Sequence, residues 1–317
     1  MINQDYQYTK FYYNPEDFFL VDNSIYFFTY SAEERSCKHV ERLRMKNSGT
    51  LFIEIETDKN TKDMILECQT SFRYNLRNEK EMQSLIQRHN SSAVYIDTTG
   101  LNSRVAASLL RNAVLLSKKK HLNIHIIYVE PHLYNVPDFK LEGVYNDLSE
   151  KIDGIEPLPG FANVMPNTDE VKFVALLGFE GGRFTYLKEC VQPPDDGIIA
   201  VIGVPGYRAE YPFVALWGNR ITLENTNSWS DIRYVAANSL VDMYFLLKKI
   251  LSELPVSYKL IVAPIGTKPH AIGAMLFALQ FPARVEIVYD NPKRKINRTS
   301  GTGKIAICDI SSLLRDN

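Results

Sequence analysis

Short apolar runs alternate with longer mixed segments through the first part of the chain. The runs are rich in Ile, Val, Tyr and Phe and lack strict alternation, which is typical of parallel strands covered on both faces. A capping box, with Ser31 as N-cap and Glu34 three residues later, opens the first predicted helix. The predicted strands are 24–30, 51–56, 93–97 and 124–130, and the predicted helices are 31–45, 79–88 and 101–119.

The same alternation starts again further along the chain. One helix, 269–279, is apolar nearly all round, so we expect it to be buried. Gly273 lies inside this helix, where a close packing contact would account for a glycine. The predicted strands are 172–177, 198–203, 259–263, 284–289 and 304–309; one helix begins near residue 183, and others span 230–254 and 269–279.

Proline and glycine interrupt this pattern at short intervals between residues 131 and 168. Such a stretch is typical of a linker or a long connection. We therefore predict an N-terminal Rossmann-like α/β domain at 1–135, a linker or long connection at 136–168, and a C-terminal Rossmann-like domain at 169–317. The predicted fold class is α/β, with two Rossmann-like units whose mostly parallel sheets are flanked by helices. One continuous sheet with a switch point is the alternative.

Charge and cysteine content narrow the function classes. The formal net charge of −1 provides no overall basic field for nucleic acid. The four cysteines form no C-x-x-C pair, which argues against a zinc ribbon or a disulfide framework and fits a reducing cytoplasm. The chain begins with polar and aromatic residues, and no apolar run reaches the roughly 18 to 20 residues of a membrane helix. We expect a cytoplasmic protein without a membrane partner.

Four loops of the second half combine features of a binding site. In open α/β sheets, ligands bind where strand ends lead into helix N-termini, whose N–H groups and partial positive charge favour phosphate. Glycine, a hydroxyl or aromatic group, and a cation recur in loops 178–183, 204–208 and 264–268, and the fourth loop, 290–294, contributes cations. The predicted ligand-binding residues are Gly178, Glu180, Gly181, Gly182, Arg183, Gly206, Tyr207, Arg208, Gly266, Thr267, Lys268, Asp290 and Asn291.

Individual roles follow from residue chemistry. Lys268 is predicted to meet a phosphate after the turn at Gly266, with Thr267 donating its hydroxyl and N–H group. Arg183 can hold a phosphate with both arms of its guanidinium. Tyr207 can stack on a base, or be a turn aromatic. Asn291 is predicted to read a base edge, and His270 is predicted to be a surface or packing residue.

Four carboxylates are the candidates for catalysis. Asp97, Glu130 and Asp290 end predicted strands, and Glu180 lies in the loop after one. A carboxylate there can hold a ribose hydroxyl, a metal or a proton in transfer, but it can also cap the next helix. For Asp97 we predict capping. The P-loop, G-x-S-x-G and H-E-x-x-H motifs and a His/Cys metal cluster are not found, so no metal and no cofactor is predicted beyond a nucleotide ligand.

Residues 266–268, Gly-Thr-Lys, with their flanking strand and helix, resemble the CARF family, the CRISPR-associated Rossmann-fold sensors of cyclic oligonucleotides. A Gly- or Ser-containing loop follows the first strand in that family, and 178–183 is similar to it. The resemblance covers at most 171–309. The candidate sensor is C-terminal here, whereas in the family it usually precedes an effector. The R-x4–6-H pair of ribonuclease effectors is missing, since Arg35 and His39 are separated by three residues.

The leading hypothesis is a nucleotide-binding or phosphorylated-ligand-binding protein. The resemblance implies a sensor or partner in a prokaryotic defence system, with any effector protein encoded elsewhere. We also expect a homodimer. An enzyme acting on nucleotides (an N-glycosidase, transferase or phosphohydrolase) and a scaffold module are the alternatives, because fold alone does not choose among them.

Overall fold

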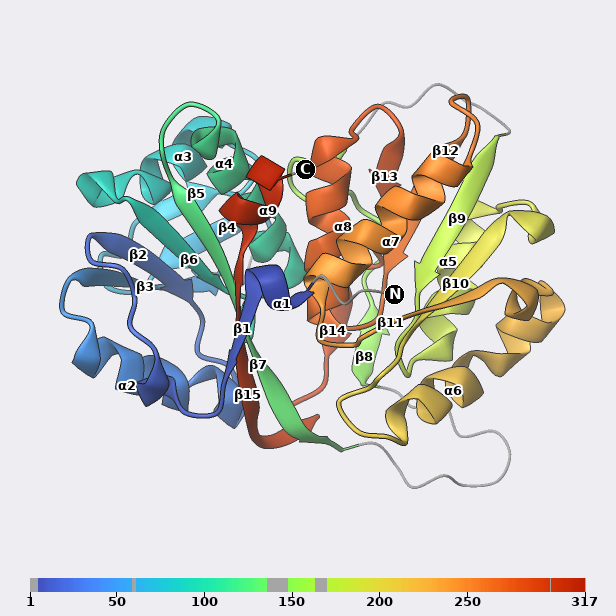
Figure 1. Ribbon diagram of the computed structural model, residues 1–317, viewed down its shortest axis with the longest axis horizontal. Coiled ribbons are helices and arrows are strands. Elements are labelled where there is room, and N and C mark those ends of the chain that lie inside the picture. Colours follow the sequence, from blue (N-terminus) through green and yellow to red (C-terminus); the bar gives the residue numbers. More distant parts are fainter. Residues whose placement is uncertain (1–4, 59–60, 136–147, 163–169, 297, 317) are drawn as a thin grey trace. The chain divides into compact units, whose positions relative to one another are not determined.

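The computed structural model describes residues 5–58, 61–135, 148–162, 170–296 and 298–316 (Figure 1). The chain forms two compact units. Unit 1 comprises Met1–Tyr134 and Thr299–Asn317, and unit 2 comprises Asn135–Arg298. Unit 2 is therefore inserted into the sequence of unit 1, between two of its strands.

Unit 1 is built on a mixed sheet of eight strands in the order β1-β15-β7-β6-β2-β3-β4-β5. The strands β7, β6, β2 and β3 pair in parallel, whereas the outer pairings are antiparallel. The bounds are β1 Thr9–Tyr12, β2 Ser24–Phe28, β3 Thr50–Thr57, β4 Met64–Glu67, β5 Arg73–Asn75, β6 Ala93–Asp97, β7 Asn123–Tyr134 and β15 Thr299–Asp309.

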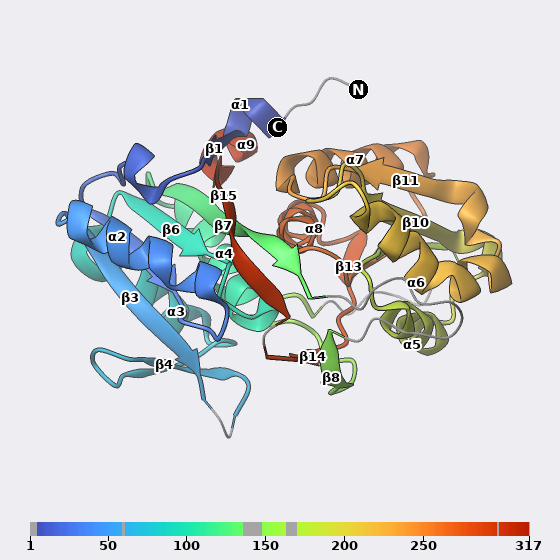
Figure 2. The ribbon, with the colours of Figure 1, turned by 90° about the horizontal axis from the view of Figure 1, so that it is seen from below.

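Helices cover both faces of this sheet, with α2 on one face and α3 and α4 on the other (Figure 2). The strands β2 and β6 are buried along their whole length, as parallel strands between two helical layers should be. The helices are α1 Asp5–Tyr8, α2 Lys38–Lys46, α3 Glu79–Ile86, α4 Ser103–Ser117 and α9 Ile310–Asp316, with short 3-10 turns η1 Pro15–Asp17, η2 Glu34–Ser36 and η3 Arg88–Asn90.

Unit 2 contains a sheet of five parallel strands in the order β11-β10-β9-β12-β13. The chain starts at the central strand β9, builds outward on one side, and then crosses to the other side at β12. The switch point therefore lies between β9 and β12. The bounds are β9 Val171–Leu176, β10 Ile198–Gly203, β11 Ile232–Val235, β12 Lys259–Pro264 and β13 Val285–Ile287, with β8 Ser149–Ile152 and β14 Pro292–Arg294 forming a separate antiparallel ribbon.

Four helices complete the Rossmann-like layers of unit 2. The helices α5 and α6 lie on one face of the sheet, and α7 and α8 lie on the other (Figure 2). The bounds are α5 Gly181–Val191, α6 Tyr211–Asn225, α7 Leu240–Glu253 and α8 Lys268–Gln280, with 3-10 turns η4 Asp195–Gly197 and η5 Ser228–Asp231. The predicted α/β class with two Rossmann-like units is thereby confirmed.

The division of the chain differs from the predicted boundaries in two places. The strand predicted at 304–309 was placed in the C-terminal domain, but β15 pairs with β7 and β1 in unit 1. Of the predicted linker 136–168, residues 136–147 and 163–168 lie outside the described residues. Residues 149–152 form β8, because β14 offers them an antiparallel partner within unit 2.

Two predicted helices also differ from the structure. The helix α2 begins at Lys38 and not at Ser31, because the Ser31 hydroxyl bonds to Ser36 within the preceding loop. The predicted helix 230–254 is only helical from Leu240, after the Ser239 side chain caps its first turn. The residues before it form η5 and the edge strand β11, and α6 had no predicted counterpart.

The buried small-residue helix is confirmed as α8. Ten of its residues, from Pro269 to Ala278, are buried. A Cβ atom at Gly273 would overlap the carbonyl oxygen of Leu240 and approach Cβ of Met243 to 3.1 Å. Gly273 therefore permits the close contact between α8 and α7.

Candidate functional site

The loops that leave β9 and β12 touch each other at the switch point of unit 2. A Cβ atom at Gly178 would lie 3.0 Å from the carbonyl oxygen of Ile265 and 3.2 Å from Cα of Gly266. A Cβ atom at Gly266 would lie 2.7 Å from the carbonyl oxygen of Leu177. Gly178 and Gly266, both predicted site residues, are therefore brought together. The packing of the two loops requires glycine at both positions, whether or not a ligand is present.

Arg183 lies at this junction but its guanidinium is already engaged. Its Nε and Nη2 atoms donate to the two carboxylate oxygens of Asp290 at 2.7 and 2.6 Å, and Nη1 donates to the carbonyl oxygen of Ile265 at 3.0 Å. Both side chains are almost completely buried. Burial opposes the charge of Arg183, but the hydrogen bonds and charge of Asp290 hold the pKa of Arg183 above its ordinary value. The bidentate contact that we predicted between the Arg183 guanidinium and a phosphate is thus made with Asp290 instead.

Glu180 joins this pair to the ribbon of β8 and β14. Its Oε2 atom accepts from Nη1 of Arg183 at 3.4 Å and from Nη1 of Arg294 at 2.7 Å. Its Oε1 atom is buried and has no hydrogen-bond partner among the described residues. Burial and the charge of Arg183 lower the pKa of Arg294. The cluster of Glu180, Arg183, Asp290 and Arg294 contains two carboxylates and two guanidinium groups, so its charges cancel.

The N-terminus of α5 follows directly after Glu180. Glu180 occupies the N-cap position without a side-chain capping bond, and the first turn holds no acidic residue. Gly181 is packed against α6, because a Cβ atom there would overlap the carbonyl oxygen of Gly218. Gly182 is exposed, and a Cβ atom at that position would have no neighbour within 4 Å. The first turn of α5 is therefore accessible to solvent at Gly182.

Hydrogen bonds to the segment after β11 fix the start of α8. Thr267 is the N-cap: its hydroxyl donates to the carbonyl oxygen of Ala237 at 2.7 Å and accepts from the His270 N–H at 3.3 Å. Nε2 of His270 donates to the carbonyl oxygen of Ala236 at 2.9 Å. The Thr267 hydroxyl predicted to bind a ligand is therefore used internally. Lys268 is partly exposed at the first position of the helix, which has no acidic residue in its first turn.

The loop after β10 is tied to the same segment. The Tyr207 hydroxyl donates to the carbonyl oxygen of Ala237 at 3.1 Å, so the ring is anchored and half-buried. Gly206 is enclosed by its own turn, because a Cβ atom there would lie 2.9 Å from Cδ of Pro212. Arg208 is exposed and pairs with Glu210. These three predicted site residues thus belong to the neighbouring loop, and no hydrogen bond described here joins their side chains to the cluster around Glu180.

Asn291 has a structural role. Its backbone is left-handed, with φ of 47°, and its side-chain amide donates to the carbonyl oxygens of Gly154, Glu156 and Tyr289. An amide with three backbone acceptors holds the segment around residue 154 to the end of the sheet. The structure offers no support for the predicted reading of a base edge.

The two candidate carboxylates of unit 1 lie elsewhere. Asp97 is buried, and its carboxylate accepts from the Tyr26 hydroxyl at 2.9 Å and the Thr99 N–H at 2.9 Å and contacts Nε2 of His39 at 2.5 Å. Burial would raise the pKa of Asp97, but His39 holds it below its usual range. The predicted capping role is wrong, since Asn102 caps α4. Glu130 does not end a strand, because β7 continues to Tyr134.

Three positioning residues had no counterpart among the predicted site residues: Asn219, Ala237 and Arg294. The Asn219 amide donates to the carbonyl oxygen of Gly178 at 2.8 Å from within α6. Ala237 accepts hydrogen bonds through its backbone carbonyl oxygen, and the identity of its side chain gives no sign of this role. Arg294 belongs to the predicted binding loop 290–294, and its positive charge was the sequence feature that could have identified it as a site residue.

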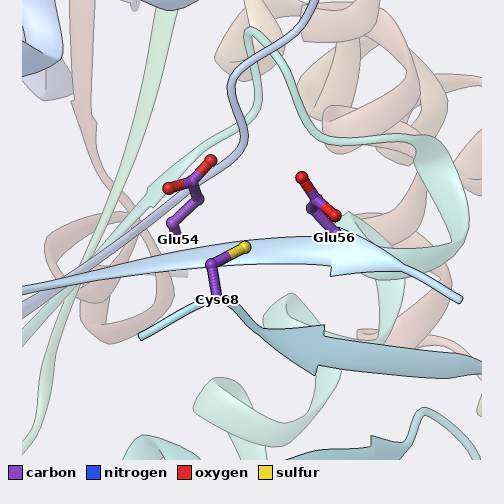
Figure 3. A group of neighbouring side chains, drawn as sticks. All are labelled: Glu54, Glu56 and Cys68. Carbon is purple, nitrogen blue, oxygen red and sulfur yellow. The ribbon is translucent and has the colours of Figure 1, made fainter. Parts of the chain in front are cut away.

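Unit 1 also contains a group of metal-ligating side chains. Glu54 and Glu56 project from one face of β3 beside Cys68, and their ligand atoms lie within 4.8 Å of one another (Figure 3). Burial and the neighbouring glutamates raise the pKa of Cys68 to about 11. The free thiol is therefore protonated at neutral pH, and a metal ion would have to displace this proton in order to bind. Since the carboxylates are also partly or fully exposed, we assign no metal to this group.

None of the helices in the described part of the chain is long and apolar enough to span a membrane. No protein-family model matches the chain, and no curated protein is significantly similar to it.

Proposed function

We propose that unit 2 binds a nucleotide or another phosphorylated small molecule at the carboxyl ends of β9 and β12. The observation that supports this most directly is the pairing of two helix starts at the switch point. The loops before α5 and α8 touch at Gly178 and Gly266, and neither helix has an acidic residue in its first turn. Partial positive charges at two adjacent helix N-termini favour an anion.

Charge at the site supports the same conclusion. The carboxylates of Glu180 and Asp290 are balanced by Arg183 and Arg294, so they leave no net negative charge beside the helix starts. Lys268, at the first position of α8, adds a cation. We assign phosphate contact to Lys268 and to the backbone around Gly182, in place of Arg183.

Recognition is the role that this arrangement favours over turnover. Asp290 and Asp97 are enclosed by hydrogen bonds, and Glu130 is within a strand, so these carboxylates are poorly placed as acids or bases. The G-T-K segment adds support for a sensor or partner in a prokaryotic defence system, with the effector on another chain. The enzyme alternative now rests on Glu180, because one of its carboxylate oxygens has no partner within the described structure.

Calorimetric titration tests this proposal. The probes are the four ribonucleoside 5′-monophosphates, cyclic dinucleotides and inorganic phosphate, with product analysis to detect turnover. We expect Lys268→Ala to weaken the best-binding nucleotide by about 1.5 to 3 kcal/mol, the range for hydrogen bonds to charged groups. Lys249→Ala, at an exposed position near the end of α7, is the matched control. Absence of binding by every probe, or equal affinity of the two variants, would contradict the proposal.

A further inference from the structure

We propose that Glu180 accepts a hydrogen bond from a ribose hydroxyl, so that the site of unit 2 selects ribonucleotides over deoxyribonucleotides. This inference rests on the proposed function and adds the chemical class of the ligand. Its starting point is the Oε1 atom of Glu180, which is buried and has no partner within the described residues, on a side chain that is only 5% exposed. Buried polar atoms in folded proteins nearly always have a partner, so a donor is expected here in the functioning state.

Hydrogen bonds from Arg183 and Arg294 fix the Glu180 carboxylate and leave Oε1 available as an acceptor. Arg183 and Arg294 both donate to Oε2, which fixes the carboxylate and leaves Oε1 without a donor from either of them. Their positive charges also allow a phosphate to bind near the carboxylate. The side chain does not cap α5, although Glu180 is its N-cap residue.

The position of Glu180 in the sequence matches the chemistry of a nucleotide. The acceptor and the helix start come from consecutive residues, Glu180, Gly181 and Gly182, and the last of these is exposed. A nucleotide presents a phosphate and ribose hydroxyl donors within one small molecule. Carboxylates at strand ends commonly bind ribose hydroxyls in Rossmann-like folds. Inorganic phosphate offers the anion alone and leaves Oε1 unsatisfied.

A second buried acceptor lies next to the same helix start. The Oδ1 atom of Asn219 has no partner in the described structure, and its orientation is set because its amide nitrogen donates to two carbonyl oxygens, those of Gly178 and Ala215. Cα of Asn219 would lie 3.4 Å from a Cβ atom at Gly181. Among the side chains described beside the first turn of α5, two buried acceptors and no buried donor lack a partner, which favours a ligand that donates hydrogen bonds in addition to carrying a phosphate.

The test compares ribose and deoxyribose forms of the same probes. The ribonucleoside 5′-monophosphates and cyclic diadenylate are titrated alongside their 2′-deoxy and 3′-deoxy counterparts, with inorganic phosphate as the probe without ribose. For the wild-type protein we expect at least one deoxy form to bind about tenfold more weakly, as for a lost hydrogen bond to a charged group. We expect Glu180→Gln to reduce this ratio to about twofold or less, while the variant still binds phosphate, because removal of the carboxylate charge does not oppose an anion.

The glutamine variant is informative because of the arginines. Since Arg183 and Arg294 donate to the Oε2 position, the amide oxygen should face them and the amide nitrogen should replace Oε1. An acceptor thereby becomes a donor at unchanged size. Glu189→Gln, at an exposed position later in α5, is the control and should keep the wild-type ratio.

The outcomes separate this inference from the proposed function. If ribose and deoxyribose forms bind the wild-type protein equally, ligand binding stands and the role of Glu180 is overturned, with a water molecule as the partner of Oε1. If no nucleotide binds, both proposals fail. The wild-type ratio decides the inference even if Glu180→Gln does not fold.

Discussion

His270 is a neutral histidine that holds the start of α8 in place. The side chain is fully buried, and burial lowers its pKa to about 4. Its Nε2 atom donates to the carbonyl oxygen of Ala236, which requires the tautomer with the proton on Nε2. The residue therefore packs inside unit 2, one of the two roles predicted for it.

This lowered pKa predicts a loss of stability in acid. The unfolded chain binds the proton near pH 6.5 and the folded chain only near pH 4, so between these values the unfolded state binds more protons. The stabilisation is fully present above about pH 6.5 and is lost as the pH falls towards 4. Between pH 7.5 and 4.5 we expect the wild-type protein to lose about 2 to 3 kcal/mol more unfolding free energy than His270→Gln, whose amide can donate but does not titrate. Urea titrations measure both, and equal losses would contradict the assignment.

The residues of the site show what a sequence can predict at this scale. Loops with glycine and cations at strand ends predicted where Glu180, Arg183 and Lys268 lie, because strand ends in such folds meet at one edge of the sheet. The partner of Arg183 was not predictable from local spacing. Asp290 lies 107 residues away and reaches the guanidinium only through the sheet order. A buried arginine and an exposed one look the same in the sequence.

Two glycines in helices of unit 2 should respond oppositely to the same substitution. Glycine ordinarily costs a helix roughly 0.5 to 1 kcal/mol relative to alanine. Gly182→Ala should recover part of this in α5, since a Cβ atom there meets no neighbour within 4 Å. Gly273→Ala should instead lower the unfolding free energy by about 1 to 3 kcal/mol, because the new Cβ atom overlaps the backbone of Leu240. Thermal and urea unfolding of both variants are the measurement, and stabilisation by both would show that α7 and α8 are not in close contact.

Elements were predictable where the apolar pattern was dense. The strands β6 and β10 were predicted with the bounds that the structure shows, since both are buried and rich in β-branched residues. The edge strand β11 was predicted as part of a helix. Only one of its four residues is buried, so its pattern is weak, and its strand form depends on pairing with β10. Edge strands owe their conformation to a neighbour, which a local pattern does not contain.

The division of the chain into two units depends on its last strand, β15. The sequence restarts its α/β pattern after residue 168, which led to a C-terminal domain that extended to the end of the chain. The final strand β15 instead pairs with β7, from Asp309 opposite His125 to Thr299 opposite Tyr134. The apolar content of a strand does not specify which sheet it joins. The insertion of unit 2 into unit 1 was therefore not predictable from pattern alone.

This insertion predicts how the chain can be divided. Tyr134 and Thr299 are paired neighbours at the ends of β7 and β15, so a two-residue Asn-Gly turn can replace residues 135–298 and close a hairpin. We expect this shortened chain to unfold cooperatively by circular dichroism, and the excised segment 135–298 to do so as well. A fragment of residues 1–134 should fail to fold, because without β15 one edge of β7 and the partner of β1 are missing. Cooperative unfolding of 1–134 alone would show that β15 is dispensable and that unit 1 ends before the insertion.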